Sequence, residues 1–165
     1  MGDKGNEHLA TYLNDHLAGS VVAIELMEHL EATFAGTPVA AFVAELRADV
    51  ETDRRELEAL MVQLQIAESR TRKASAWLTE KFTELKLRLD DPAGGELRLF
   101  ESYEALSLGI EGKRSLWLAL SAAAADTPAL QIVDYGRLIQ RAEEQRSRVE
   151  ARRLEAAKTA LSLTK

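Results

Sequence analysis

The stretch MEHLEATFAGTPVAAFVAEL, residues 27–46, decides the fold of this chain. On both sides of Gly36 an apolar residue recurs every three or four positions, which is the spacing of one buried face of an α-helix. Gly36 ends the first helix, Thr37 is a suitable N-cap for the second, and Pro38 suits its first turn. A connection this short forces the two helices into an antiparallel hairpin.

The same periodicity continues outward from this hairpin through most of the chain. It predicts helices at about 7–35, 38–68, 71–89, 96–124 and 128–163, and no segment alternates apolar and polar residues as a strand does. We therefore predict one all-α domain over residues 1–165. We interpret the shorter helix at 71–89 as part of a long crossover between the second and fourth segments. The expected architecture is a ferritin-like four-helix bundle with a short extra helix in that crossover.

Composition excludes several classes of protein. A net charge of −6 argues against a general nucleic-acid binder, which normally has a basic face. The absence of cysteine excludes disulfides, thiolate metal sites and thiol catalysis, and it fits a reducing compartment. The polar start of the chain and the lack of a long apolar stretch predict no signal region and no membrane association. We therefore expect a cytoplasmic protein.

The histidines argue against the chemistry that ferritin-like bundles usually carry. A di-iron site needs Glu-x-x-His from two different helices and a glutamate from each of the others. Here His8, His16 and His29 all fall in the first predicted helix, and no Glu-x-x-His occurs. No serine, histidine and acid arrangement suggests nucleophilic catalysis either. We predict no cofactor and no catalytic residues, which favours a non-enzymatic protein.

One polar pair lies within the apolar stripes of the hairpin. His16 and Asp53 are nearly equidistant from Gly36, so a rise of about 1.5 Å per residue places them within about 4–5 Å of the same height. Glu104 and Glu111, on the segment 96–124, could reach the same middle layer, as could Glu143, Gln145 and Arg146 on the segment 128–163. Of these, His16, Asp53, Glu104 and Glu111 could form a metal or small-ligand site. Alternatively, they form a buried polar network that fixes how the helices pack.

Two further patterns concern helix packing. Gly109 and Gly112 interrupt a helical pattern, and we expect their bare backbone to let a neighbouring helix approach closely, near residues 18–20. The segment 137–158 is rich in arginine, whereas 45–58 is rich in acidic residues. We expect these two faces to complement each other within the bundle or across a dimer.

Four phrases of the sequence also resemble a known family. They are Tyr12-Leu-Asn-Asp-His-Leu-Ala-Gly, Ala76-Trp-Leu-Thr-Glu-Lys, Leu108-Gly-Ile-Glu-Gly-Lys-Arg-Ser-Leu-Trp and Arg141-Ala-Glu-Glu-Gln-Arg. Together they resemble a bacterial family of ferritin-like helical bundles that has no established activity and lacks the usual di-iron ligands. The resemblance covers most of the chain and implies a bundle without iron storage or ferroxidase activity.

These observations leave two hypotheses for function. The first is a non-enzymatic bacterial helical-bundle protein that acts through protein–protein contacts, as a homodimer or with a partner that the sequence does not identify. The alternative is a degenerate ferritin-like protein that binds a metal or a small ligand. Its candidate residues are His16, Asp53, Glu104 and Glu111.

Overall fold

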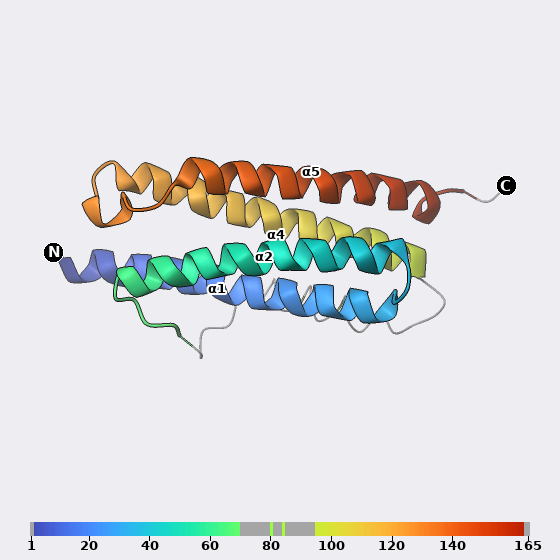
Figure 1. Cartoon of the computed structure of the whole chain (residues 1–165), viewed down its shortest axis with the longest axis horizontal. Helices are drawn as coiled ribbons and strands as arrows, with labels where there is room; N and C mark the ends of the chain where they lie inside the picture. The colour runs from blue at the N-terminus through green and yellow to red at the C-terminus, as the bar shows by residue number, and fades with distance from the viewer. Residues whose placement is uncertain (1, 70–79, 81–83, 85–94, 164–165) are drawn as a thin grey trace.

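The computed structural model describes residues 2–69, 80, 84 and 95–163, and within them it is built from four long helices (Figure 1). They are α1 (Gly2–Thr33), α2 (Pro38–Gln63), α4 (Gly95–Ala124) and α5 (Tyr135–Ala160), with a short 3₁₀-helix η2 (Pro128–Leu130). These ranges contain no strand, which confirms the all-α prediction. No helix within them is long and apolar enough to cross a membrane. Of the predicted helix at 71–89, only Glu80 and Glu84 are described, and both are helical.

The four helices pack as two antiparallel hairpins, α1 with α2 and α4 with α5 (Figure 1). The hairpins meet through contacts of α1 with α4 and of α2 with α5. In Figure 1, α2 and α4 run in the same direction, so the end of α2 and the start of α4 lie at opposite ends of the bundle. No short turn could join them, which distinguishes this arrangement from a simple up-down-up-down bundle.

The hairpin between α1 and α2 forms where the sequence predicts it. Gly36 has a φ of 78°, a left-handed conformation that suits glycine, and Pro38 begins α2. Thr37 occupies the N-cap position with extended backbone, but its hydroxyl makes no capping bond to α2. It donates instead to the carbonyl oxygen of Phe34 at 2.7 Å, so it closes the end of α1.

The last helix begins later than the predicted residue 128. Pro128 starts η2, and α5 begins only at Tyr135. The reason is Asp134, whose carboxylate accepts the backbone N–H of Arg137 at 3.0 Å and caps the helix. The chain between Pro128 and Asp134 forms a turn, and this turn carries Leu130 into the core.

The apolar core consists of two clusters. One surrounds Leu26, Leu46 and Leu106, towards the hairpin turn of α1 and α2, and the other surrounds Leu13, Leu60 and Trp117. Between Leu17 and Leu26, α1 has no fully buried residue. On α2, the buried residue between the clusters is Asp53, which interrupts the aliphatic stripe. The middle of the bundle is therefore polar on one side and loosely packed on the other.

Candidate functional site

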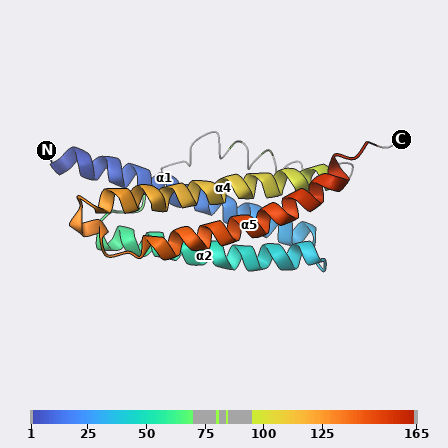
Figure 2. The same cartoon turned by 90° about the horizontal axis from the view of Figure 1, so that it is seen from above.

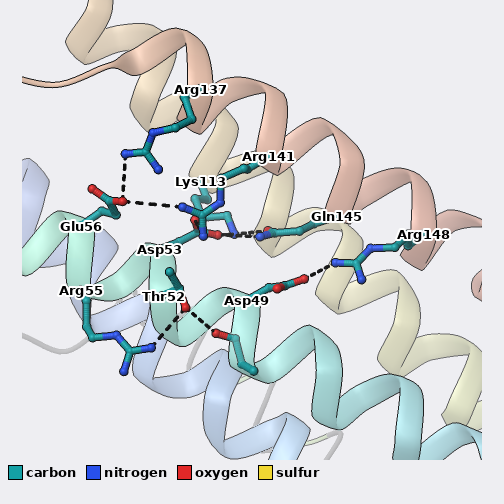
Figure 3. Close-up of polar contacts among 11 residues, drawn as sticks. Asp49, Thr52, Asp53, Arg55, Glu56, Lys113, Arg137, Arg141, Gln145 and Arg148 are labelled. Carbon is teal, nitrogen blue, oxygen red and sulfur yellow. Dashed lines mark hydrogen bonds and ion pairs between the residues drawn. The ribbon is translucent and has the colours of Figure 1, made fainter.

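Asp53 is the centre of a polar layer that joins α2, α4 and α5 (Figure 3). Its side chain is 2% exposed. Oδ2 accepts hydrogen bonds from Lys113 Nζ at 2.5 Å and from Gln145 Nε2 at 2.8 Å. Oδ1 lies 2.9 Å from Arg141 Nη2 in an ion pair. We call these four residues the polar layer, and their contacts link α2, α4 and α5.

Lys113 completes the layer because its ammonium also donates to Gln145 Oε1. Burial lowers the pKa of Lys113, and the negative charge of Asp53 offsets part of that effect. A buried ammonium is stable only when its charge is paired and its donors are used. Here the carboxylate pairs the charge, and the carboxylate and the amide oxygen accept two of the three ammonium donors, so we interpret the layer as a network that stabilises a buried charge.

The predicted pairing of His16 with Asp53 takes a different form. Both residues line one cavity. The hydrogen bonds of Asp53 go to Lys113 on α4 and to Gln145 on α5. The sequence places Gln145 within reach of this middle layer but does not single out Lys113. The His16 ring packs edge-on against Tyr12, with ring centroids 4.7 Å apart. Burial lowers the pKa of His16, while the charge of Asp15 raises it.

Glu104 and Glu111 do not join Asp53, because both turn towards α5 at the bundle surface. The Glu104 side chain is 48% exposed and pairs with Arg153 at 3.4 Å. Glu111 pairs with Arg114 at 3.1 Å and with Arg146 at 3.5 Å. The predicted cluster of four residues is therefore divided between a buried aspartate, a cavity wall and the surface.

The polar layer does not fit the metal centre that a ferritin-like bundle implies. Among the described residues, no group of three or more histidine, aspartate or glutamate side chains is placed to hold a metal ion. The layer has one carboxylate, and two cations, Lys113 and Arg141, already neutralise it. A divalent ion there would meet net positive charge, so the donor set argues against iron.

The charged faces of α2 and α5 do complement each other within the bundle, as the sequence predicts (Figure 3). Asp49 pairs with Arg148, and Glu56 pairs with Arg137 at 2.9 Å and with Arg141 at 3.7 Å. These outer pairs are partly exposed, and such pairs usually contribute less than about 1 kcal/mol each. They set the alignment of α5 on α2 more than its stability.

A cavity of about 290 Å³ lies beside the polar layer, between α1, α2 and α4. Figure 2 shows that α1 crosses α4 at an angle instead of following it. Most of the lining is apolar, with side chains from both core clusters: Met27, Leu46, Val50, Leu57, Ile110 and Leu116. Asp53 and Lys113 form a polar part of the wall, and His16 lines the side contributed by α1.

Three glycines also line this cavity, Gly19 on α1 and Gly109 and Gly112 on α4. A Cβ atom added at any of them would meet no atom of the described residues within 4 Å. The expectation that these glycines allow close approach of two helices is therefore wrong. The space that their missing side chains would occupy is part of the cavity.

No protein-family model, no curated protein and no solved structure matches this chain. Function must therefore be argued from the site itself.

Proposed function

We propose that this chain is a ferritin-like helical bundle that binds a small apolar molecule in the cavity between α1, α2 and α4. The parallel direction of α2 and α4 supports the ferritin-like topology, since such bundles have one long crossover. The observation that carries the binding function is the cavity itself, with three bare glycines in its wall. The polar layer then has a structural role, because it holds the three helices around one side of that space.

The size of the cavity suits a compact ligand. Its volume of about 290 Å³ is near the lower end of ligand pockets, roughly 300–1,000 Å³. An apolar cavity of about 150 Å³ is enough to bind benzene. The ligand we propose therefore has the bulk of one or two small rings, or of a short branched chain.

Packing energetics also favour an occupant. The glycine positions leave this space open, although alanine there would fill part of it without a clash. A ligand that fills the space would recover dispersion contacts and remove its own apolar surface from water.

The test uses α-methylstyrene, a compact apolar probe, and thermal unfolding. A ligand that binds only the folded state at ten times its Kd adds about 1.4 kcal/mol, which raises Tm by several degrees in a protein of this size. Gly109→Leu should fold and abolish the shift, because its side chain grows into the cavity. Gly5→Leu is the matched control, since Gly5 is an exposed helical glycine that does not line the cavity.

Two results would contradict the proposal. One is an unchanged Tm of the wild-type protein up to the solubility limit of the probe. The other is an equal shift in wild type and Gly109→Leu, which would place the binding elsewhere.

A second candidate function is protein–protein contact, in the first place as a homodimer. The observation that favours it is a pair of exposed leucines near the end of α5, Leu154 at 54% and Leu161 at 59%. Leu154 lies on α5, and Leu161 is its C-cap residue. Light scattering of the wild-type protein and of Leu154→Glu with Leu161→Glu tests this. A dimer that the double variant dissociates supports the proposal, and a wild-type monomer at high concentration contradicts it.

A further inference from the structure

His16 is a polar side chain in the middle of the cavity face of α1. Tyr12, His16, Ser20 and Ala23 follow one another at steps of three or four residues, and all four line the cavity. Residues at this spacing share one face of a helix. His16 has a lining residue one turn before it and another one turn after it, so its ring projects from α1 towards the cavity.

The imidazole of His16 is both accessible and unused. The residue is partly exposed, and its ring packs edge-on against Tyr12. Among the described residues, neither ring nitrogen takes part in a hydrogen bond, and neither is one of the fully buried polar atoms that lack a partner. A group of the size of a water molecule or a hydroxyl can therefore reach them.

Most of the other polar side chains in the wall are already engaged. Asp53 and Lys113 hydrogen-bond within the polar layer. Arg54 is held in an ion pair within α2, and the Ser20 hydroxyl donates to the backbone of its own helix. The hydroxyl of Tyr12 is free to bond, but this side chain is 37% exposed, so water can bond to it. His16 is the more enclosed of the two aromatic residues and the better placed to recognise a ligand inside.

The imidazole and its surroundings define the polar group that a ligand can carry. Burial lowers the pKa of His16, although Asp15 raises it, so above neutral pH the ring has one donor and one acceptor nitrogen. A hydroxyl can donate and accept, so it matches either nitrogen. A carboxylate would place a second negative charge near Asp15, and a cation would lie in the same wall as Lys113. An uncharged hydroxyl avoids both costs, which are large in an apolar cavity.

Resting on the proposed function, we propose that the ligand is an uncharged, mostly apolar molecule with one hydroxyl group, such as a small phenol, and that a ring nitrogen of His16 forms a hydrogen bond with this hydroxyl. The apolar part of the ligand lies against the aliphatic side chains of α2 and α4. His16 is then the residue that selects hydroxyl compounds over hydrocarbons of the same shape.

The experiment compares two probes of nearly equal shape, p-cresol and p-xylene, which differ in OH against CH₃. Calorimetric titration gives the Kd of each probe for the wild-type protein and for His16→Phe, which keeps a flat ring beside Tyr12 and removes both nitrogens. The cost of removing each probe from water is the same for both proteins, so it cancels in the ratio of ratios. We expect His16→Phe to weaken p-cresol relative to p-xylene by about fivefold, the usual size of one net hydrogen bond.

Two further variants locate the effect. His8→Phe is the matched control, because His8 is an exposed histidine of the same helix that does not line the cavity, and it should leave the ratio unchanged. Tyr12→Phe removes the other hydrogen-bonding group of this wall that has no partner among the described residues. A ratio that changes in Tyr12→Phe but not in His16→Phe would assign the hydroxyl of the ligand to Tyr12 and overturn the role of His16.

A second measurement keeps His16 in place. At about pH 8, above the usual histidine pKa of about 6.5, the ¹⁵N resonances of the imidazole rings report hydrogen bonds to their nitrogens. Saturating p-cresol should move a ring nitrogen of His16 much further than saturating p-xylene does. The ring nitrogens of His8 should stay in place with both probes.

The outcomes separate the two proposals. An unchanged ratio in His16→Phe, together with equal responses of the His16 nitrogens to both probes, would overturn the hydrogen bond and leave the cavity as a hydrocarbon site. Binding of p-xylene without binding of p-cresol would do the same. If neither probe binds the wild-type protein, the proposed function fails and this inference fails with it. If His16→Phe binds neither probe, the ¹⁵N resonances of the wild-type protein decide.

Discussion

The two sides of α4 are packed in different ways. The side that faces α5 is joined by polar contacts along its length, such as Ser107 with Glu150 at 2.6 Å and Arg114 with Glu143 at 3.0 Å. The side that faces α1 contains Gly109 and Gly112, and there the helices leave a cavity. Glycine permits close approach but does not cause it. The distance between α1 and α4 is set by the bulky side chains around the glycines and by the angle at which α1 crosses (Figure 2).

The polar layer should give the largest effect, because its charges are buried. Asp53→Ala leaves Lys113 and Arg141 without their carboxylate, and breaking a buried pair in this way costs about 3–5 kcal/mol. Urea unfolding measures the loss. Asp49→Ala removes only the exposed pair with Arg148 and should cost less than about 1 kcal/mol. Similar losses in the two variants would mean that Asp53 is not the centre of the layer.

Alanine at Gly109 and alanine at Gly36 should change the free energy of unfolding in opposite directions. Gly109→Ala should raise the free energy of unfolding by about 0.5–1 kcal/mol, since alanine is the better helix former and its methyl group enters open space. Gly36→Ala should lower it by about 1 kcal/mol, because the backbone there has a φ of 78°. Chemical denaturation compares the two. A destabilised Gly109→Ala would show that the wall beside the cavity is tightly packed after all.

The smallest expected effect is a pH dependence from the cavity wall. Because burial lowers the pKa of His16, the unfolded chain binds its proton more readily than the folded protein does. The stability from neutral His16 is complete above the unfolded pKa of about 6.5 and is lost as pH falls towards the folded pKa. Between pH 7 and 5 we expect a loss of up to about 1 kcal/mol that His16→Gln does not show. Identical pH profiles for the two proteins would contradict the buried position of His16.

Local signals predicted much of this fold. The turn at Gly36 and Pro38 and the burial of Asp53 follow from helical periodicity and from residues that lie close in sequence. Of the partners of Asp53, Gln145 was predicted to reach the same layer, but Lys113 was missed, although Lys113 also occupies a stripe position, three residues after Ile110. To pair them, one must know which helices are neighbours, and that is a tertiary property.

The errors have physical reasons too. Glu104 and Glu111 each lie one residue beyond a buried stripe position, Tyr103 and Ile110, and a step of about 100° around the helix takes them off that stripe and towards α5. The cavity could not be predicted, because glycine in a helix is equally consistent with close packing and with open space.

The most direct test of the account is a ¹H–¹⁵N correlation spectrum of the protein titrated with α-methylstyrene. Glycine amides resonate apart from most others and can be followed individually. If the probe binds in the cavity, the amides of Gly19, Gly109 and Gly112 should shift and saturate together, while those of Gly5, Gly36 and Gly136, which do not line it, should stay in place. No saturable shift of the first three, or equal shifts of all six, would contradict a ligand site between α1, α2 and α4.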